Sequence, residues 1–286
     1  MEVQITEEII ERTIVSFDYA IKYILRDKSN FDVLSGFLSE LLNRQVIVQE
    51  ILESEGNVTD RYDKLNRLDL KAKIDNGEIA VFEIQFFDQI DFLGKVLFNA
   101  CKAVVEQVSR GELFDIKKVY SVNIAYFDLG AKKEYVFRAN ISSFSGIHFD
   151  EAIPFSQNLN PPSVANDLHP EYYLILPNKF DEHIRGKFDE WIYALKNSAI
   201  KSEFTAAGIQ TAGEKLDLLK MTPEQRAEYD RLKTDRMSQK SQFYTAELKG
   251  KTERTIEIAK RLKNLGVLSA QISQATGLTI EEIENL

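Results

Sequence analysis

Several kinds of residue pattern are missing from this 286-residue chain, and each absence argues against a class of protein. Cys101 is the single cysteine, which excludes an internal disulfide and fits a reducing cytoplasm. No stretch approaches the roughly 20 apolar residues of a membrane-spanning helix. The acidic N-terminal residues do not resemble the basic start of a signal peptide. We therefore expect a cytoplasmic protein without membrane association.

An excess of cations is also missing. The formal net charge is -9, which argues against a protein that coats nucleic acid by charge alone. If the chain handles phosphate, it must do so locally or through a bound metal ion. The three histidines have no metal-ligand spacing and no companion cysteines, so a zinc site is not expected.

The chain does contain alternating helix-like and strand-like patterns. Hydrophobic periodicity predicts helices over 5–28, 30–43 and 91–111, strands over 46–52 and 118–127, and a hairpin between the two groups. This order favours a mixed α/β core. The helix over 91–111 has an apolar stripe that we expect to face the core, with Cys101 packed beside it: Leu93, Leu97, Ala100, Val104 and Val108.

The C-terminal part of the chain reads as helical. A helix is predicted from Thr222 onward, 236–250 reads as a polar connection or a loosely amphipathic helix, and 251–286 holds three short helices. The last two resemble a helix-turn-helix, but residues 267–286 contain no Lys or Arg and three Glu, so packing or self-association is favoured over groove binding. We divide the chain into 1–200, a core domain; 201–250, a helical linker region; and 251–286, a small helical tail.

The hairpin over 66–87 brings two acids together if its register preserves the apolar face. A two-residue turn would pair polar with apolar residues, because a slip of one residue exchanges the two faces of a strand. A three-residue turn, Asp75-Asn76-Gly77, instead pairs Leu70 with Phe82 and Asp69 with Glu83. Directly opposed side chains have Cβ atoms about 4.5–5.5 Å apart, where like charges are unfavourable.

A divalent cation would relieve this repulsion. Asp69 and Glu83 could supply two oxygens to Mg²⁺ or Mn²⁺, and the backbone carbonyl of Ile84 could add a third. Gln85 faces the same way as Glu83 and could orient a water or a phosphate oxygen. Such a metal site would activate water for attack on a phosphodiester.

An alternative remains open for this hairpin: its polar face is only solvated, and Lys71 and Lys73 neutralise the acids. Asp18 and Lys22 have a similar pair of interpretations. At i,i+4 on a helix they form either a simple surface pair or a support for the site.

The order of these motifs resembles the Rpn-type branch of the PD-(D/E)XK nuclease superfamily, the recombination-promoting nucleases. Glu83-Ile84-Gln85 fits that branch, in which Gln commonly replaces the motif lysine. FDYAIKYIL (17–25) resembles its N-terminal Asp and Lys motif, and EQVSRGELF (106–114), with Gln107, resembles its Gln-x-x-x-Gly segment. Positions that are Arg and Tyr in the branch are Lys95, Phe98 and Asn99 in this chain.

The resemblance implies an α/β, restriction-endonuclease-like αβββαβ core with a helical C-terminal extension. It also implies metal-dependent cleavage of DNA, with Mg²⁺ and possible use of Mn²⁺ or Ca²⁺. We expect a DNA endonuclease linked to recombination or mobile elements, with catalytic Asp69, Glu83 and Gln85, supporting Asp18, Lys22 and Gln107, and self-association through the C-terminal helices. The alternative is a catalytically silent DNA-binding or assembly protein that retains the fold, and cleavage of RNA stays open.

Overall fold

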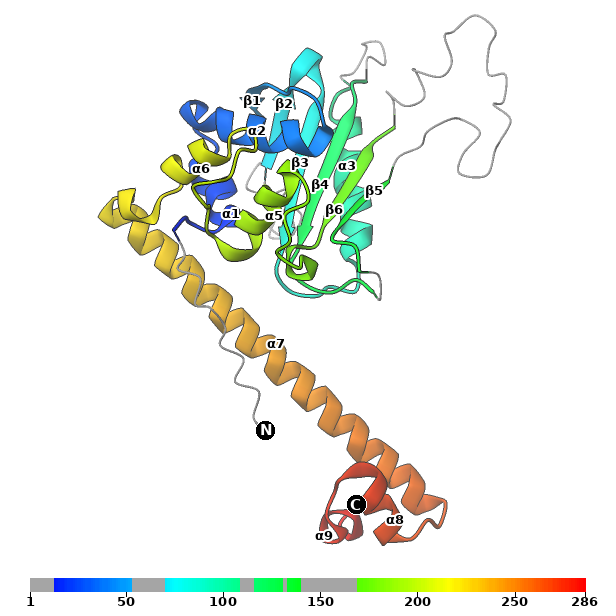
Figure 1. Ribbon diagram of the computed structural model, residues 1–286. Helices are drawn as coiled ribbons and strands as arrows, with labels where there is room; N and C mark the ends of the chain where they lie inside the picture. Colours follow the sequence, from blue (N-terminus) through cyan, green and yellow to red (C-terminus); the bar gives the residue numbers. More distant parts are fainter. Residues whose placement is uncertain (1–12, 53–69, 109–115, 131–132, 140–168) are drawn as a thin grey trace, which may run out of the picture. The chain divides into compact units, whose positions relative to one another are not determined.

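The structure is a computed structural model that describes residues 13–52, 70–108, 116–130, 133–139 and 169–286. The chain forms two units, Met1–Arg226 and Ala227–Leu286. The first unit contains a six-stranded sheet in the order β1-β2-β3-β4-β6-β5 (Figure 1). Its strands are β1 (Val48–Ile51), β2 (Leu70–Ile74), β3 (Ile79–Gln85), β4 (Val119–Ala125), β5 (Val136–Ala139) and β6 (Glu171–Ile175).

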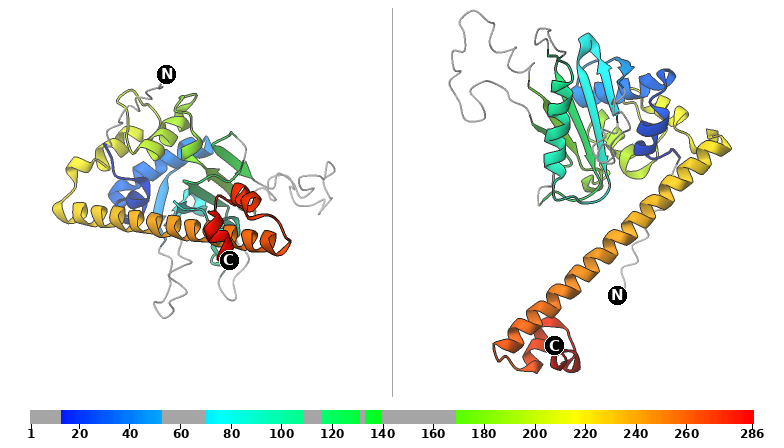
Figure 2. Two further views of the ribbon diagram at one scale, coloured as in Figure 1. Left: turned by 90° about the horizontal axis from the view of Figure 1, so that it is seen from below. Right: turned by 180° about the vertical axis from the view of Figure 1, so that it is seen from behind.

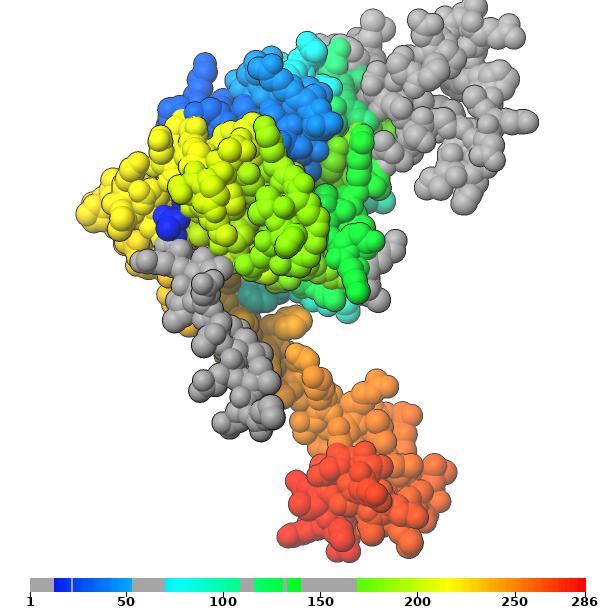
Figure 3. Space-filling model, in the orientation of Figure 1, coloured from blue at the N-terminus to red at the C-terminus, as the bar shows by residue number. Residues whose placement is uncertain are grey.

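Helices cover both faces of this sheet. They are α1 (Phe17–Tyr19), which continues as a π-helix (Ala20–Ile24), α2 (Phe31–Leu42), α3 (Phe92–Val105), α5 (Lys187–Asn197) and α6 (Ile209–Lys215). Helix α3 lies on one face, and α1, α2, α5 and α6 lie on the other (Figures 1 and 2). The surfaces of α2 in blue and α5 in yellow-green adjoin in the space-filling view (Figure 3).

The mixed α/β fold class is confirmed. Strand pairs β1–β2, β2–β3 and β5–β6 are antiparallel, whereas β3–β4 and β4–β6 are parallel. Parallel neighbours need a crossover connection, and α3 supplies it between β3 and β4. Aromatic rings fill the core on the opposite face: the ring of Phe37 lies 6.1 Å from that of Phe82 and 5.4 Å from that of Trp191.

The predicted hairpin register is confirmed for every described pair. Leu70 lies opposite Phe82 and Ala72 opposite Ala80. The turn is Asp75-Asn76-Gly77, and both Asn76 (φ 54°) and Gly77 (φ 86°) adopt the left-handed conformation that Asn and Gly tolerate best. The turn chemistry and the apolar alternation therefore specify the same pairing.

The predicted face of the α3 helix is right only in part: Ala100 is buried and Val104 packs against the core, but the two leucines at the start of the stripe do not. Leu93 and Leu97 are exposed, and the buried residues are Phe92, Val96, Asn99, Ala100 and Ala103. Both sets recur at helical spacing, so periodicity alone does not choose between them. Cys101 is also exposed rather than packed, and the helix ends at Val105, before the expected cap at Gly111, which lies outside the described residues.

The first predicted helix is also shorter than expected. Ile14 is bridged to Asp217 in extended conformation, and helical structure begins at Phe17 within the described residues. Residues 5–12 of the predicted helix over 5–28 lie outside the part of the chain that the structure describes.

The second unit is built around one long helix. Helix α7 (Pro223–Asn264) runs through 236–250, so of the two alternatives for that region the helix holds and the polar connection does not, and α8 (Ser269–Thr276) and α9 (Ile280–Glu284) follow. The last two pack on the end of α7 through Ala259, Ile272 and Ile283. The expected caps are confirmed: Thr222 exchanges hydrogen bonds with Gln225, and Thr279 with Glu282. No helix among the described residues is both long enough and apolar enough to cross a membrane.

Candidate active site

Glu83 is a buried carboxylate in the middle of the sheet. It lies near the end of β3 with only 3% of its surface exposed. Its neighbour across the parallel β3–β4 pair is Asn123, which is 2% exposed. Both side chains stand on the sheet face that α3 covers, because paired residues of adjacent strands share a face. A buried carboxylate is costly unless cations or hydrogen bonds compensate it.

Helix α3 supplies that compensation. Lys95 Nζ lies 2.5 Å from Glu83 Oε1, and Asn99 Nδ2 donates to Glu83 Oε2 over 3.1 Å. Lys95 and Asn99 are four residues apart, so they project from the same side of the helix. The carboxylate is therefore held at both oxygens by one turn of α3.

The face around Glu83 is not the solvated surface that the alternative interpretation requires. Lys71 of β2 is 9% exposed, and its ammonium lies 2.7 Å from Glu106 Oε2. Glu83 and Lys71 of the hairpin thus pair with side chains of α3 and its C-cap rather than with water alone.

The donor set suits a hard cation. Glu83 offers a carboxylate, and the buried Oδ1 of Asn99 has no hydrogen-bond partner within the described residues. Carboxylate and amide oxygens are the ligands that Mg²⁺ and Ca²⁺ prefer. The described ranges contain no group of three His, Cys, Asp or Glu side chains that could hold a metal by itself. These residues fit a divalent cation only if Glu83 shares its oxygens between that cation and Lys95, and if further ligands join them.

The other predicted site residues have different places. Asp69, and the side chain of Lys22, lie outside what the structure describes. Gln85 is half-buried, on the same face of β3 as Glu83, and its Nε2 donates to Phe87 O over 3.3 Å. Ile84 lies between them with a buried side chain.

Asp18 lies in a helix, whereas Gln107 lies in the turn after one. Asp18 is 3% exposed in α1, so it is not part of a surface pair. Gln107 follows the end of α3, where its amide bonds to Lys117 N (2.8 Å) and Lys117 O (3.2 Å). It braces the crossover toward β4, three turns of helix from Lys95.

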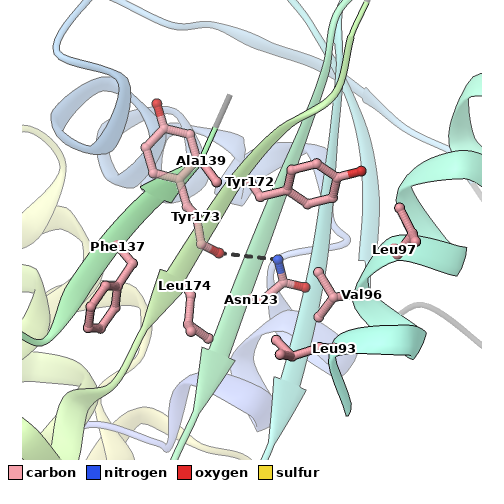
Figure 4. A pocket seen from close by; sticks show the side chains of 9 residues that line it. All are labelled: Leu93, Val96, Leu97, Asn123, Phe137, Ala139, Tyr172, Tyr173 and Leu174. Atoms are coloured by element: carbon pink, nitrogen blue, oxygen red, sulfur yellow. Dashed lines mark hydrogen bonds between the residues drawn. The ribbon is translucent and has the colours of Figure 1, made fainter. Parts of the chain in front are cut away.

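An apolar cavity of about 320 Å³ adjoins the site on the same face of the sheet (Figure 4). Asn123 lies among the residues that line it, and its amide donates to Tyr173 O over 3.2 Å. The remaining walls are Leu93, Val96, Leu97, Phe137, Ala139, Tyr172, Tyr173 and Leu174. Among these wall residues none carries a carboxylate and only Asn123 offers a side-chain amide oxygen, so the cavity is a poor site for a divalent cation.

Comparison with known families bears on this arrangement. Residues 15–246 match the family described as PD-(D/E)XK nuclease family transposase. The chain belongs to this family. No curated protein and no solved structure matched the chain in the same comparisons.

Membership in the PD-(D/E)XK nuclease family transposases supports a hydrolase acting on nucleic acid, and nucleases of this superfamily generally use divalent metal ions. The match spans the whole sheet and α3, so Glu83, Lys95 and Asn99 all fall within it. Their contacts are consistent with the family's nuclease character.

Lys95 and Asn99 were not among the site residues expected from the sequence. They were recognised only as departures from the family pattern, since Leu93 and Leu97 indicated a different buried face. The signal that could have found them is their i,i+4 spacing, which Ala103 continues. This spacing places Lys95, Asn99 and Ala103 on one side of the helix.

A second buried glutamate, Glu171 of β6, provides a contrast on the opposite face. Its carboxylate accepts hydrogen bonds from Arg138 Nε (2.5 Å) and from the Tyr173 hydroxyl, and Lys118 Nζ lies 3.6 Å away. Burial by itself would raise the pKa of Glu171, but the hydrogen bonds and cations outweigh it and hold the pKa below its usual 4.5. Burial, and the hydrogen bond that its hydroxyl donates to Glu171, raise the pKa of Tyr173.

We expect Glu171→Gln to lower the free energy of unfolding by about 1–2 kcal/mol near neutral pH. Because the folded pKa of Glu171 lies below its unfolded value, this stabilisation is present above about pH 4.5 and is lost as pH falls through the folded pKa. Urea unfolding of both proteins from about pH 3.5 to about pH 8 should show the difference shrinking on the acid side. A difference that stays constant over this range would contradict the assignment.

Proposed function

We propose that this protein is a metal-dependent DNA endonuclease that hydrolyses phosphodiester bonds, with the activity in the domain 1–200. The observation that carries the proposal is the buried Glu83 carboxylate, held by Lys95 and Asn99 within the matched family region. Like other members of its superfamily it would use a divalent cation, for which we propose Mg²⁺, with Mn²⁺ or Ca²⁺ as possible substitutes.

The proposed cation ligands are Asp69, Glu83 and the carbonyl of Ile84. The hairpin register supports the pairing of the two acids, because Leu70 opposite Phe82 implies residue 69 opposite residue 83 if the ladder continues by one residue. A divalent cation, when bound, supplies Lewis-acid chemistry: it offsets phosphate charge and makes a water more acidic. Gln85, on the same face as Glu83, would orient that water or a phosphate oxygen.

We further propose that Lys95 takes the place of the lysine that the family motif has at position 85. Gln85 cannot act as a cation, whereas the Lys95 ammonium lies beside Glu83. It would neutralise the carboxylate before a cation binds and would face the phosphate afterwards. Asp18, Lys22 and Gln107 would support the site through the packing of their helices.

The natural role would be in recombination or mobile elements in the cytoplasm, and the C-terminal helices would mediate self-association. Exposed apolar side chains in that region, Leu265, Leu268 and Ile280, support self-association. One observation favours the alternative of a catalytically silent DNA-binding or assembly protein: Lys95 already occupies one oxygen of Glu83.

The experiment that separates these functions combines cleavage and binding. Supercoiled plasmid and a matched RNA would be incubated with the purified full chain in Mg²⁺, Mn²⁺, Ca²⁺ or EDTA, and calorimetry would measure Mg²⁺ and Mn²⁺ binding directly. The proposal requires metal binding and cleavage that EDTA abolishes. A folded protein that binds no metal and cleaves neither substrate would favour the assembly protein.

We expect Lys95→Met to reduce metal-dependent cleavage by about 10–100-fold, in line with losses for groups that contact a metal ligand. Without metal the variant should also melt a few degrees lower, because Glu83 loses its cation. Added Mg²⁺ should then raise its melting temperature more than it raises that of the wild type. Plasmid cleavage and thermal unfolding with and without Mg²⁺ measure these effects.

Lys95→Arg is the matched control because it keeps the charge. It should retain the stability of the wild type in EDTA and part of the cleavage rate. If Lys95→Met cleaves at the rate of the wild type, Lys95 is only a neutralising partner of Glu83 in the metal-free protein.

A further inference from the structure

Helix α7 is almost entirely exposed within its own unit. Of its 42 residues, only Tyr229 and Ala259 are buried. A helix that is polar all round is stabilised by many i,i+4 pairs or serves to bridge through solvent. Two such pairs are present, Lys251 with Glu247 and Arg261 with Glu257.

The net charge of the helix is opposite in sign to the charge of the whole protein. Residues 231–263 contain ten Lys and Arg against four Asp and Glu, so this segment is +6 in a chain whose net charge is -9. The remainder of the chain is therefore -15. The tail that follows, 267–286, has three Glu and no Lys or Arg. Net positive charge is thus concentrated on residues 231–263 of α7, and the helix as a whole, with eleven Lys and Arg against seven Asp and Glu, is +4.

The cations of α7 are sorted by face. At 100° per residue, six of them fall within an arc of roughly 80°, which we call the basic stripe. The basic stripe consists of Lys233, Arg236, Lys240, Lys251, Arg254 and Arg261. Five of the seven acids gather elsewhere, in a second arc that holds Glu224, Glu228, Asp235, Glu253 and Glu257, and Asp230 lies in neither arc. The single acid on the basic stripe is Glu247, which pairs with Lys251.

Aromatic side chains accompany the basic stripe. Phe243 is 49% exposed and Tyr244 is 61% exposed, and both lie in the interval between Lys240 and Lys251. From Lys233 to Arg261 the stripe spans roughly 42 Å of helix at 1.5 Å per residue. Duplex DNA presents one negative charge about every 1.7 Å, so this length faces many phosphates.

We propose that the basic stripe of α7 binds the phosphate backbone of a nucleic acid duplex. Because the remainder of the chain is acidic, a local cation surface such as this one favours the approach of a polyanion. The helix-turn-helix-like pair α8 and α9 lacks cations and does not serve this purpose. This inference deepens the proposed function. It rests on that function in one respect, the choice of nucleic acid as the polyanion.

The test measures binding without cleavage. Fluorescence anisotropy of a labelled 30-base-pair duplex would be followed with the full chain in EDTA, across a series of salt concentrations. The stripe variant is Lys233→Gln, Lys240→Gln and Arg254→Gln. The control variant is Arg231→Gln, Lys249→Gln and Lys260→Gln, which removes two Lys and one Arg from the acid-bearing side of the same helix.

We expect the stripe variant to bind the duplex at least about tenfold more weakly than the wild type and to lower the slope of log affinity against log salt by about 2–3. The control variant should change affinity by less than about threefold. Equal weakening by both variants would overturn the proposal, because only net charge would then matter.

Other outcomes identify other partners and also overturn it. Binding of the wild type to phosphatidylserine vesicles but not to the duplex would assign the stripe to a membrane surface. A change of mass by light scattering in the stripe variant alone would assign it to self-association. Binding is measured in EDTA, which prevents metal-dependent cleavage, so the two activities are tested separately. A protein that binds the duplex through the stripe but cleaves no substrate when metal is supplied would overturn the nuclease proposal and leave this inference intact.

Discussion

Replacement of Glu83 by Gln is expected to reduce metal-dependent cleavage by at least about 10³-fold. A bound metal contributes several kcal/mol of transition-state stabilisation, and each 1.36 kcal/mol is a factor of about ten in rate. Lys95 and Asn99 donate to different oxygens of the carboxylate, so the single amide oxygen of Gln can accept from one of them in the same geometry, and the variant loses the negative charge that holds a divalent cation. Plasmid cleavage with Mg²⁺ and calorimetric titration of Mg²⁺ measure the two consequences.

Glu171→Gln is the matched control for this experiment. Glu171 is also buried, at 5% exposed, but it stands on the other face of the sheet with Arg138 and Tyr173. This variant should lose some stability and keep its cleavage rate at 25 °C. If Glu83→Gln binds Mg²⁺ and cleaves as the wild type does, the site lies elsewhere.

Gly36→Ala is expected to destabilise the first unit by about 3 kcal/mol, at the upper end for overpacking. A Cβ at Gly36 of α2 would lie 2.4 Å from Ala207 O and 2.6 Å from Gly208 Cα. Both are backbone atoms, so no side-chain rotation relieves the clash. Gly208 has φ 71° and would itself place a Cβ 2.9 Å from Gly36 Cα. Urea unfolding should show a lower midpoint.

Gly94→Ala provides the comparison within the same unit. Gly94 lies in α3, and nothing stands within 4 Å of the Cβ it would gain. Alanine is favoured over glycine in a helix interior by roughly 0.5–1 kcal/mol, so this variant should be neutral or slightly more stable. Similar unfolding midpoints for the two variants would contradict this prediction. They would mean that α2 can move away from Ala207 and Gly208, the residues before α6, and so relieve the clash.

The hairpin register could be predicted from sequence because its determinants are local. Asn76 and Gly77 both accept positive φ, and the alternation of Leu70, Ala72, Ala80 and Phe82 admits few pairings. The caps at Thr222 and Thr279 follow from equally local hydrogen bonds. Asp69, one half of the predicted acid pair, lies outside the described residues, so that pair stays a prediction.

The face of α3 could not be predicted because two apolar sets compete on it. Leu93 and Leu97 are more hydrophobic than Asn99 and Ala103, and nothing local indicates that β3 presents a carboxylate to the helix. The buried Glu83 selects the side that carries Lys95 and Asn99, since these side chains compensate its charge. A tertiary interaction thus overrides the hydrophobic pattern.

The length of α7 was missed for a related reason. Its central residues have few apolar side chains, and Gly250 is unfavourable within a helix. The interval therefore read as either a polar connection or a loosely amphipathic helix, and the sequence did not join it to the predicted helices on both sides. Sorting of charges by face, rather than hydrophobicity, distinguishes it as continuous helix.

The described groups around Glu83 come from a single β3–α3–β4 unit: Glu83, Lys95, Asn99 and Asn123 lie within one short stretch of consecutive chain. Contacts of such low sequence separation lose little loop-closure entropy, and topologies rich in them fold fast. The carboxylate and its lysine can therefore meet early in folding, before β5 and β6 add to the sheet. A charged group that would be costly to bury alone is then already paired when the interior closes around it.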